Sequence, residues 1–214
     1  RLAPDLSDLA PGERKALDEL LAVGAIFQRV YEDSRHPQAL ASSAGLDGDL
    51  ATLYRLFQGP IATTLDNRRE PFLAVEPETP GKNVYPWGIG AAEIEDFLAS
   101  RQERRGEILG ERTALRRATR ESLERDLAAL ARHPVLEGLH PGLRERLAAL
   151  ARTPYAEALY AVPYAVAWAD EMVAAQRGLF RAADAVEGDD AELARYLRNR
   201  GRDLLANDYE SGDA

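Results

Sequence analysis

The residues most able to do chemistry are three histidines, His36, His133 and His140, and each is followed by proline. A zinc hydrolase needs at least three protein ligands, usually two histidines at helical spacing and a carboxylate. A residue that precedes proline is pushed out of the helical region of backbone space. The spacing therefore predicts histidines at helix boundaries, and it predicts no metal site in this chain.

Other catalytic patterns are also missing from the sequence. The chain has no cysteine, which excludes a thiol nucleophile, a thiolate metal site and a disulfide framework. It contains no nucleophile elbow, P-loop or dinucleotide-binding fingerprint. Gly88 and Gly90 precede a predicted helix, but they follow Tyr85-Pro86-Trp87 instead of a strand, and the third glycine is missing. Among 36 acidic residues nothing selects an acid/base pair, so we predict no catalytic residue and no cofactor here.

The composition is that of a soluble globular protein. The chain has 214 residues, is 45% hydrophobic and has a mean hydropathy of −0.37. No apolar run approaches the ~18 residues of a membrane span. The net charge of −9 argues against nucleic acid as a partner, because binding to phosphates needs a basic surface. The chain begins with Arg1, so we expect a removed leader or upstream segment, and the compartment, cytoplasmic or exported, stays open.

Helical periodicity covers most of the chain. Helices are predicted over 11–32, 47–58, from 91 onward, and over 119–131, 141–151, 163–186 and 191–205. In the second of these, one apolar face is formed by Leu50, Leu53, Tyr54 and Phe57. The pattern predicts that these side chains lie on the same side of the helix.

Between residues 61 and 90 the helical period disappears, and prolines punctuate the segment. A segment of this length without regular structure is usually functional or ordered by packing, so we expect irregular or briefly extended backbone. Outside this segment, the sequence is compatible with one strand pair, formed by residues near Thr113–Arg117 and Leu159–Val162. The predicted fold is therefore mostly α, a single multi-helix domain over 1–214 with an irregular segment at about 61–90 and one short β pair.

The stretch from Arg101 to Arg120 concentrates arginine. Its arginines alternate with glutamates, a pattern typical of a solvated, salt-bridged helix face. Glu124-Arg125-Asp126, just after it, also reads as helix surface. An alternative is a helical regulator that binds acidic ligands through four arginines, namely Arg112, Arg116, Arg117 and Arg120.

Three stretches, in this order, resemble the dipeptidyl peptidase III-like zinc peptidases. The first runs from Leu53 to Leu98 and contains a "GP" turn, a "G-x-N-x-Y-P" element and an acidic helix. The second, "LYAVPYAVAWADEMVAAQRGLFRAADAV", is similar to the "VPY" start of a long helix in that family. The third, "YLRNRGRDLLANDYESGDA", matches a run in which alanine is usual where this chain has Gly201, and Gly212 looks inserted. Together the three cover roughly half the chain.

The resemblance implies the N-terminal helical portion of such a peptidase. In the family, the segment similar to Tyr209–Asp213 leads into a substrate-binding strand, and the HExxGH helix and a glutamate-bearing helix that supply the zinc ligands follow later. None of these motifs lies in the 214 residues. The resemblance thus implies zinc and a peptide substrate only for a full-length protein. It assigns no catalytic or metal-binding residue here, and it makes Tyr209 and Asp213 the candidates for the edge of the substrate cleft.

The expected partner is the remainder of the same polypeptide or a self-associated copy, because the missing part would leave apolar surface uncovered. The alternative function is a stand-alone helical binding module without catalysis. For the candidate residues, the alternative is structural: Tyr209 as an aromatic packed at the end of the last helix, and Asp208 and Asp213 as solvated caps.

Overall fold

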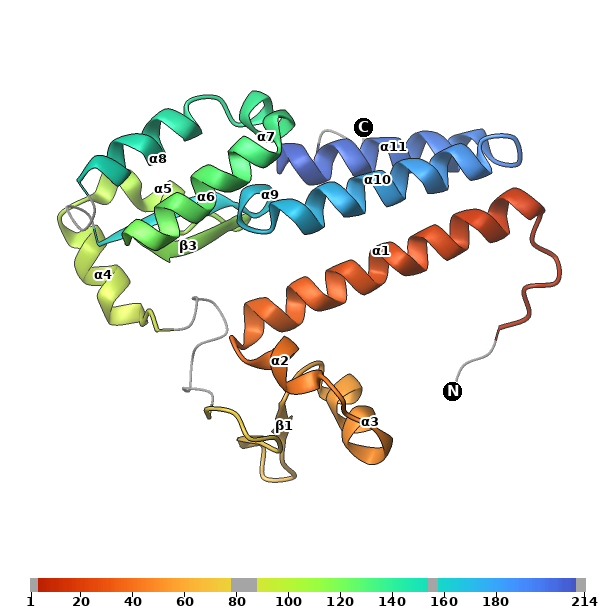
Figure 1. Ribbon diagram of the computed structural model, residues 1–214, viewed down its shortest axis with the longest axis horizontal. Helices are drawn as coiled ribbons and strands as arrows, with labels where there is room; N and C mark the ends of the chain where they lie inside the picture. Colours follow the sequence, from red (N-terminus) through yellow and green to blue (C-terminus); the bar gives the residue numbers. More distant parts are fainter. Residues whose placement is uncertain (1–3, 78–87, 154–157, 211–214) are drawn as a thin grey trace. The chain divides into compact units, whose positions relative to one another are not determined.

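The computed structural model describes residues 4–77, 88–153 and 158–210, and within these the chain is mostly α-helical (Figure 1). Backbone contacts divide the chain into two compact units. Unit 1 comprises Arg1–Phe27, Arg117–Glu157 and Val162–Ala214, and unit 2 comprises Gln28–Arg116 and Ala158–Ala161. No helix within the described residues is long and apolar enough to cross a membrane.

The described part of unit 1 consists mainly of helices. Helix α1 (Pro11–Arg35) begins in this unit and ends in unit 2. The other helices of unit 1 are α6 (Arg120–Arg132), α7 (Pro134–Leu139), α8 (Leu143–Arg152), α9 (Tyr164–Ala167), α10 (Ala169–Val186) and α11 (Ala191–Ala206). The predicted helices over 11–32, 119–131, 141–151 and 191–205 are confirmed, each with small shifts of its ends.

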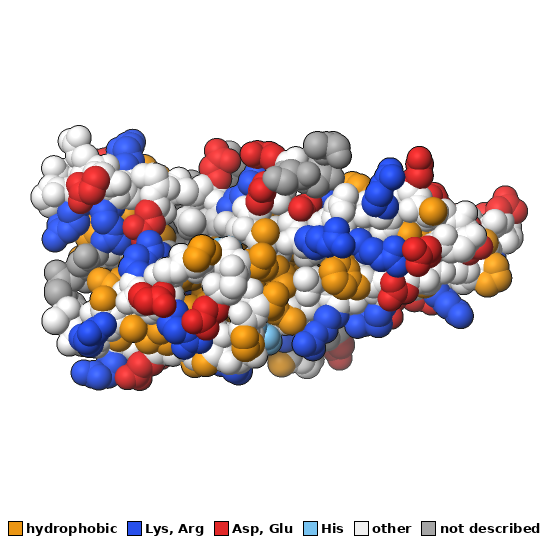
Figure 2. All heavy atoms as spheres, turned by 90° about the horizontal axis from the view of Figure 1, so that it is seen from above, with side chains coloured by type: hydrophobic (Ala, Val, Ile, Leu, Met, Phe, Trp, Pro, Cys, Tyr) orange, Lys and Arg blue, Asp and Glu red, His pale blue; other side chains and the backbone are white. Residues whose placement is uncertain are grey.

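Helices α10 and α11 form an antiparallel hairpin at the centre of unit 1 (Figure 1). Asp190 caps α11, since its carboxylate accepts a hydrogen bond from the backbone N–H of Leu193 at 2.9 Å. Across the hairpin, the Arg198 guanidinium pairs with Asp184 and Glu187, each at 2.8 Å. Basic and acidic side chains are intermixed along this hairpin in the right-hand part of Figure 2.

Unit 2 combines short helices with two small sheets. Its elements after α1 are α2 (Ala39–Ser43), α3 (Gly48–Phe57), β1 (Ile61–Thr63), β2 (Arg69–Pro71), α4 (Ala91–Ala99), the 3-10 helix η1 (Gln102–Arg104), α5 (Arg105–Ile108), β3 (Thr113–Arg117) and β4 (Leu159–Pro163). Strands β1 and β2 are antiparallel, with Ile61 opposite Pro71. Strand β3 pairs with β4, which confirms the predicted strand pair. The buried apolar cluster of this unit consists of Ile89, Ile94, Phe97, Leu98, Ile108, Leu115, Leu159 and Ala161.

The β1–β2 hairpin is the brief extended structure that was expected between residues 61 and 90. Residues 78–87 of that segment lie outside the described residues. The expectation for the first part of the segment is therefore confirmed.

The helix predicted over 47–58 is confirmed as α3, and its apolar face is buried at only one of its four side chains. Tyr54 is buried, whereas Leu50, Leu53 and Phe57 are 44%, 37% and 36% exposed. Helical periodicity shows which side chains share a face, but it does not show whether another element covers that face. Among the described residues, only the Tyr54 edge of this face is buried.

Two further predictions are corrected in unit 1. The helix predicted over 163–186 is interrupted at Trp168, whose φ of −125° and ψ of 52° are not helical and separate α9 from α10. The Trp168 ring packs edge-on against Tyr164, with 5.4 Å between ring centroids. Asp126, expected on the surface of α6, is only 1% exposed. It lies three residues after Leu123 and four before Leu130, so it shares the buried face of the helix.

The Arg101–Arg120 stretch is not one helix face. It forms η1, α5 and strand β3 before α6 begins at Arg120. Locally the expected pairing is present, because Arg104 and Glu107 form an ion pair at 3.0 Å and Arg120 lies 3.8 Å from Glu124. The Arg104 guanidinium also lies over the Phe97 ring, 5.8 Å from its centroid. The arginines of this stretch therefore stabilise short elements of different type.

Candidate functional site

The three histidines are each hydrogen-bonded to a different, distant partner. His36 Nε2 lies 2.9 Å from the carbonyl oxygen of Glu76, and His140 Nε2 lies 2.9 Å from the carbonyl oxygen of Leu205. A carbonyl oxygen only accepts, so in both rings Nε2 carries the proton and donates it. His133 Nε2 lies 2.5 Å from Asp170 Oδ1. All three sit at helix boundaries, as predicted, and they connect segments 37 to 65 residues apart.

These contacts do not make a metal site. Within the described part of the chain, no group of three or more histidine, aspartate or glutamate side chains is placed to hold a metal ion. A zinc-bound histidine uses one ring nitrogen for the metal and the other for an orienting hydrogen bond. Both ring nitrogens of His36 are already engaged, since Nδ1 accepts from the N–H of Gln38 at 3.1 Å. His36 therefore does not fit a zinc site.

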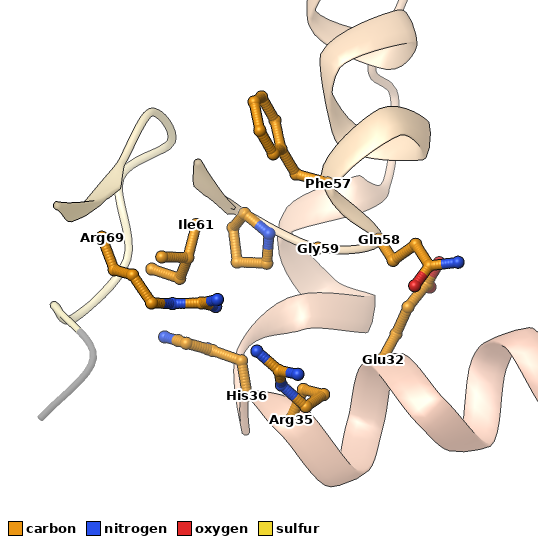
Figure 3. Close-up of a pocket in the computed structure, with 9 residues that line it drawn as sticks. Glu32, Arg35, His36, Phe57, Gln58, Gly59, Ile61 and Arg69 are labelled. Carbon is orange, nitrogen blue, oxygen red and sulfur yellow. The ribbon is translucent and has the colours of Figure 1, made fainter. Parts of the chain in front are cut away.

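A small pocket in unit 2 surrounds His36 (Figure 3). It is formed where the end of α1 meets the end of α3 and the β1–β2 hairpin, and its lining is Glu32, Arg35, His36, Phe57, Gln58, Gly59, Pro60, Ile61 and Arg69. Its volume is about 20 Å³, which is room for a single water molecule. The Arg35 and Arg69 side chains extend toward the His36 ring. The pocket is too small for a peptide or a cofactor.

The polar groups beside this pocket hold the elements of unit 2 together. The Tyr54 hydroxyl lies 3.2 Å from Glu32 Oε2 and 3.0 Å from the carbonyl oxygen of Ala39. Burial and the charge of Glu32 raise the pKa of Tyr54 to about 12, so the hydroxyl keeps its proton and serves as a donor. Glu32 accepts a second hydrogen bond from Gln28 at 2.7 Å. Glu32 and His36, four residues apart in the sequence, thus contact one pocket but bind different partners.

The C-terminal end of α11 is the second candidate region. Asn207 adopts a left-handed conformation, with φ of 61° and ψ of 23°, and ends the helix. The N–H of Asp208 then donates to the carbonyl oxygen of Asp203 at 3.2 Å, a closing pattern common at helix C-termini. The half-buried Tyr209 follows directly. The other candidate, Asp213, lies outside the described residues.

Arg200 connects this segment to the helix. Its Nη1 donates to the carbonyl oxygen of Tyr209 at 3.2 Å, and its Nη2 lies 3.0 Å from Asp203 Oδ2. The guanidinium also stacks on the ring of Tyr196, 5.3 Å from the centroid. Arg200 therefore links the backbone of Tyr209 to the side chains of Tyr196 and Asp203 on α11.

Comparison with known proteins gives a result at the level of the fold. No family model and no curated protein matches the chain. Two solved structures do match: DPP III from Caldithrix abyssi, with a TM-score of 0.68, and dipeptidyl-peptidase III from Corallococcus sp. strain EGB, with a TM-score of 0.67. Each match covers 98% of this chain at 21% identity. The fold of this chain is that of part of dipeptidyl peptidase III.

The likeness to dipeptidyl peptidase III is partial in length. The chain spans 34% of the Caldithrix protein and 33% of the Corallococcus protein. About two thirds of each of those proteins therefore lies outside the matched region. The expected fold is thus confirmed over nearly the whole of this chain, and identity of 21% establishes likeness in fold alone.

One departure from the dipeptidyl peptidase III-like sequence pattern has a structural reason. Gly201 stands where alanine is usual, and a Cβ atom at this position would come within 2.7 Å of the Phe180 ring. Glycine at 201 thus allows the α10–α11 pair to pack around the Phe180 ring. A larger residue at 201 would require this aromatic side chain to move.

Sequence reasoning missed the buried charged residues. Glu32, Asp126 and Asp203 are all buried; Asp126 was expected on the helix surface, and burial of the other two was not predicted. A signal was present for each of them, because each carboxylate occupies a position within the apolar period of its helix. Asp203, for example, precedes the buried pair Leu204 and Leu205.

Proposed function

We propose that this chain forms the non-catalytic helical portion, N-terminal to the active site, of a dipeptidyl peptidase III-like zinc peptidase, and that it builds part of the scaffold of the substrate cleft. One observation carries the proposal: the fold matches two such proteins over 98% of this chain while spanning about a third of their length. The three resembling sequence stretches occur in the family's order, which supports the same conclusion independently.

Zinc and the catalytic groups belong to the longer polypeptide in this proposal. The three histidines are bonded to Glu76, Asp170 and Leu205, and the described residues hold no group of metal ligands. No step of peptide hydrolysis is therefore assigned to a side chain of this chain. Its contribution is to position segments that approach the cleft.

Tyr209 and Asp213 are proposed to lie at the edge of that cleft. The support for Tyr209 is its anchored backbone, because Arg200 holds its carbonyl oxygen to α11. A segment that leaves a helix from a fixed point keeps a defined direction, which a substrate-contacting residue needs. Asp213 follows four residues later in the resembling run.

The test is to express the complete reading frame that encodes this chain and to measure release of dipeptides from a peptide substrate. We expect activity that a zinc chelator removes. Tyr209→Ala and Asp213→Ala should each lower kcat/KM about tenfold, a loss of ~1.4 kcal/mol in transition-state binding, with little change in Tm. Glu192→Ala, at the exposed start of α11, is the matched control and should leave kcat/KM unchanged.

Unchanged kinetics in both variants would remove the cleft assignment while leaving the peptidase proposal intact. A complete polypeptide without peptidase activity would contradict the peptidase proposal itself. The alternative, a stand-alone helical binding module, then gains support if the protein folds cooperatively and stays monomeric without zinc.

A further inference from the structure

Helix α3 carries an apolar stripe that the rest of the described chain leaves open. Leu50, Leu53, Leu56 and Phe57 recur at spacings of three and four residues, which places them on one side of the helix. They are 44%, 37%, 71% and 36% exposed. We name these four residues the α3 stripe.

The stripe belongs to the apolar face of the amphipathic helix α3, and only one edge of that face is buried. The edge at Tyr54 is buried against the end of α1, through the hydrogen bonds to Glu32 and Ala39. At the helix end, the Phe57 ring contacts Phe72, with 6.2 Å between centroids. The polar side chains of Thr52 and Arg55 lie on the other side of α3. A surface helix with this pattern normally buries the whole apolar side.

We propose that the α3 stripe is covered by an apolar face of the part of a dipeptidyl peptidase III-like polypeptide that lies outside these 214 residues. This inference rests on the proposed function. The two matching structures supply the argument for the occupant, because two thirds of their length has no counterpart in this chain. Exposed apolar stripes of this kind mark interaction surfaces.

A second copy of the chain is a less suitable occupant than the rest of the polypeptide, because the area that two stripes would bury against each other is small. A helix of 10 residues is about 15 Å long, and full burial of the stripe in two copies removes on the order of 700 Å² from water. A specific, stable interface between separate molecules needs about 1,200 Å² or more. A covalently linked segment needs less, because linkage gives it an effective concentration near the millimolar range.

Charge also argues against a second copy. The chain carries a net charge of −9, so two copies repel each other. Asp47 and Asp49 border the start of α3, which brings like charges together in a symmetric pairing of this helix. A segment of the same polypeptide with an apolar or basic surface meets no such penalty.

The absence of cysteine from the chain provides a direct test. Leu56→Cys places a thiol in the stripe, and Arg55→Cys places a matched thiol on the other side of α3, both at exposed positions. Each variant is prepared in the 214-residue chain and in the complete polypeptide. The rate of reaction with a small maleimide is followed by peptide mapping, which identifies residue 55 or 56 whatever other cysteines are present.

We expect the two thiols to react at similar rates in the 214-residue chain. In the complete polypeptide, the thiol at 56 should react about tenfold more slowly than the thiol at 55, because only the stripe is covered. Equal rates in an active complete polypeptide would overturn this inference and leave the peptidase function standing. Protection at 56 that grows with the concentration of the 214-residue chain would identify a second copy as the occupant and overturn the inference.

Dipeptide release is measured on the same preparations, so the two proposals fail separately. If the thiol at 56 is protected in a complete polypeptide that has no peptidase activity, the inference that the α3 stripe is covered stands. The same result would contradict the proposed peptidase function. A complete polypeptide that shows no protection at residue 56 and no peptidase activity would contradict both proposals.

Discussion

Arg200 Nη1 donates a hydrogen bond to the carbonyl oxygen of Tyr209, 3.2 Å away and nine residues further along the chain. The same guanidinium lies 3.0 Å from Asp203 Oδ2. Asp203 is buried, so its carboxylate and the Arg200 guanidinium form an ion pair that is largely shielded from water. The end of α11 and the backbone at Tyr209 are thus held by one side chain.

Arg200→Ala should therefore loosen the segment and destabilise the fold. We expect a loss of about 1–3 kcal/mol in the free energy of unfolding, since a buried carboxylate loses its charged partner. Hydrogen exchange at the amides of Asp208 and Glu210 should become faster. Arg202→Ala is the control, because Arg202 is exposed and donates a hydrogen bond to Asn199 Oδ1 of its own helix at 3.3 Å. Equal exchange rates in the two variants would show that Arg200 does not anchor the segment.

Asp170 should make a pH-dependent contribution to stability. The hydrogen bond from His133, together with that from Arg132 at 3.0 Å, lowers the pKa of Asp170 below its ordinary value of 3.8. A carboxyl whose pKa is lowered by folding stabilises the folded state above its ordinary pKa, and this contribution is lost as the pH falls through the lowered value. Because Asp170 is exposed, the effect is small.

Urea unfolding of the wild type and Asp170→Asn at a series of pH values measures this contribution. The wild type should be more stable at pH 7, and the difference should vanish as the pH falls below the ordinary carboxyl range. A wild-type advantage that persists in strong acid would rule out the Asp170 carboxylate as its source.

Gly201 and Gly24 should respond in opposite directions to replacement by alanine. A Cβ at 201 would lie 2.7 Å from Phe180, whereas at Gly24, inside α1, nothing lies within 4 Å. We expect Gly201→Ala to lower the free energy of unfolding by about 1–2 kcal/mol, because the clash exceeds the gain in helix propensity. Gly24→Ala should raise it by about 1 kcal/mol. Thermal unfolding compares the two, and stabilisation by both would show that the helix pair at Gly201 is not tightly packed.

Local patterns allowed much of the helical fold to be predicted. Helix α6, for instance, repeats apolar residues at Leu123 and Leu130, and its start at Thr119 is a capping residue whose hydroxyl accepts from the N–H of Ser122. Such signals depend only on neighbours along the chain. The β3–β4 pair was also found, because the β4 segment contains Tyr160 and Val162, which favour strands.

Errors arose where distant contacts decide the outcome. The break at Trp168 has no proline or glycine to mark it. Periodicity also did not show how much of the apolar face of α3 is covered. Asp126 is buried by elements that the sequence of α6 alone does not specify. The candidate site has the same limit: Tyr209 was identified through resemblance, whereas its anchor Arg200 could be found only in the folded structure.

The most direct test of the central claim is the measurement of dipeptide release by the polypeptide translated from the complete reading frame, before and after removal of zinc by a chelator. The proposal predicts release of dipeptides from the N-terminus of a peptide, loss of that activity with the chelator and its return with added zinc. A properly folded polypeptide that releases no dipeptide in the presence of zinc would contradict the assignment to a dipeptidyl peptidase III-like enzyme.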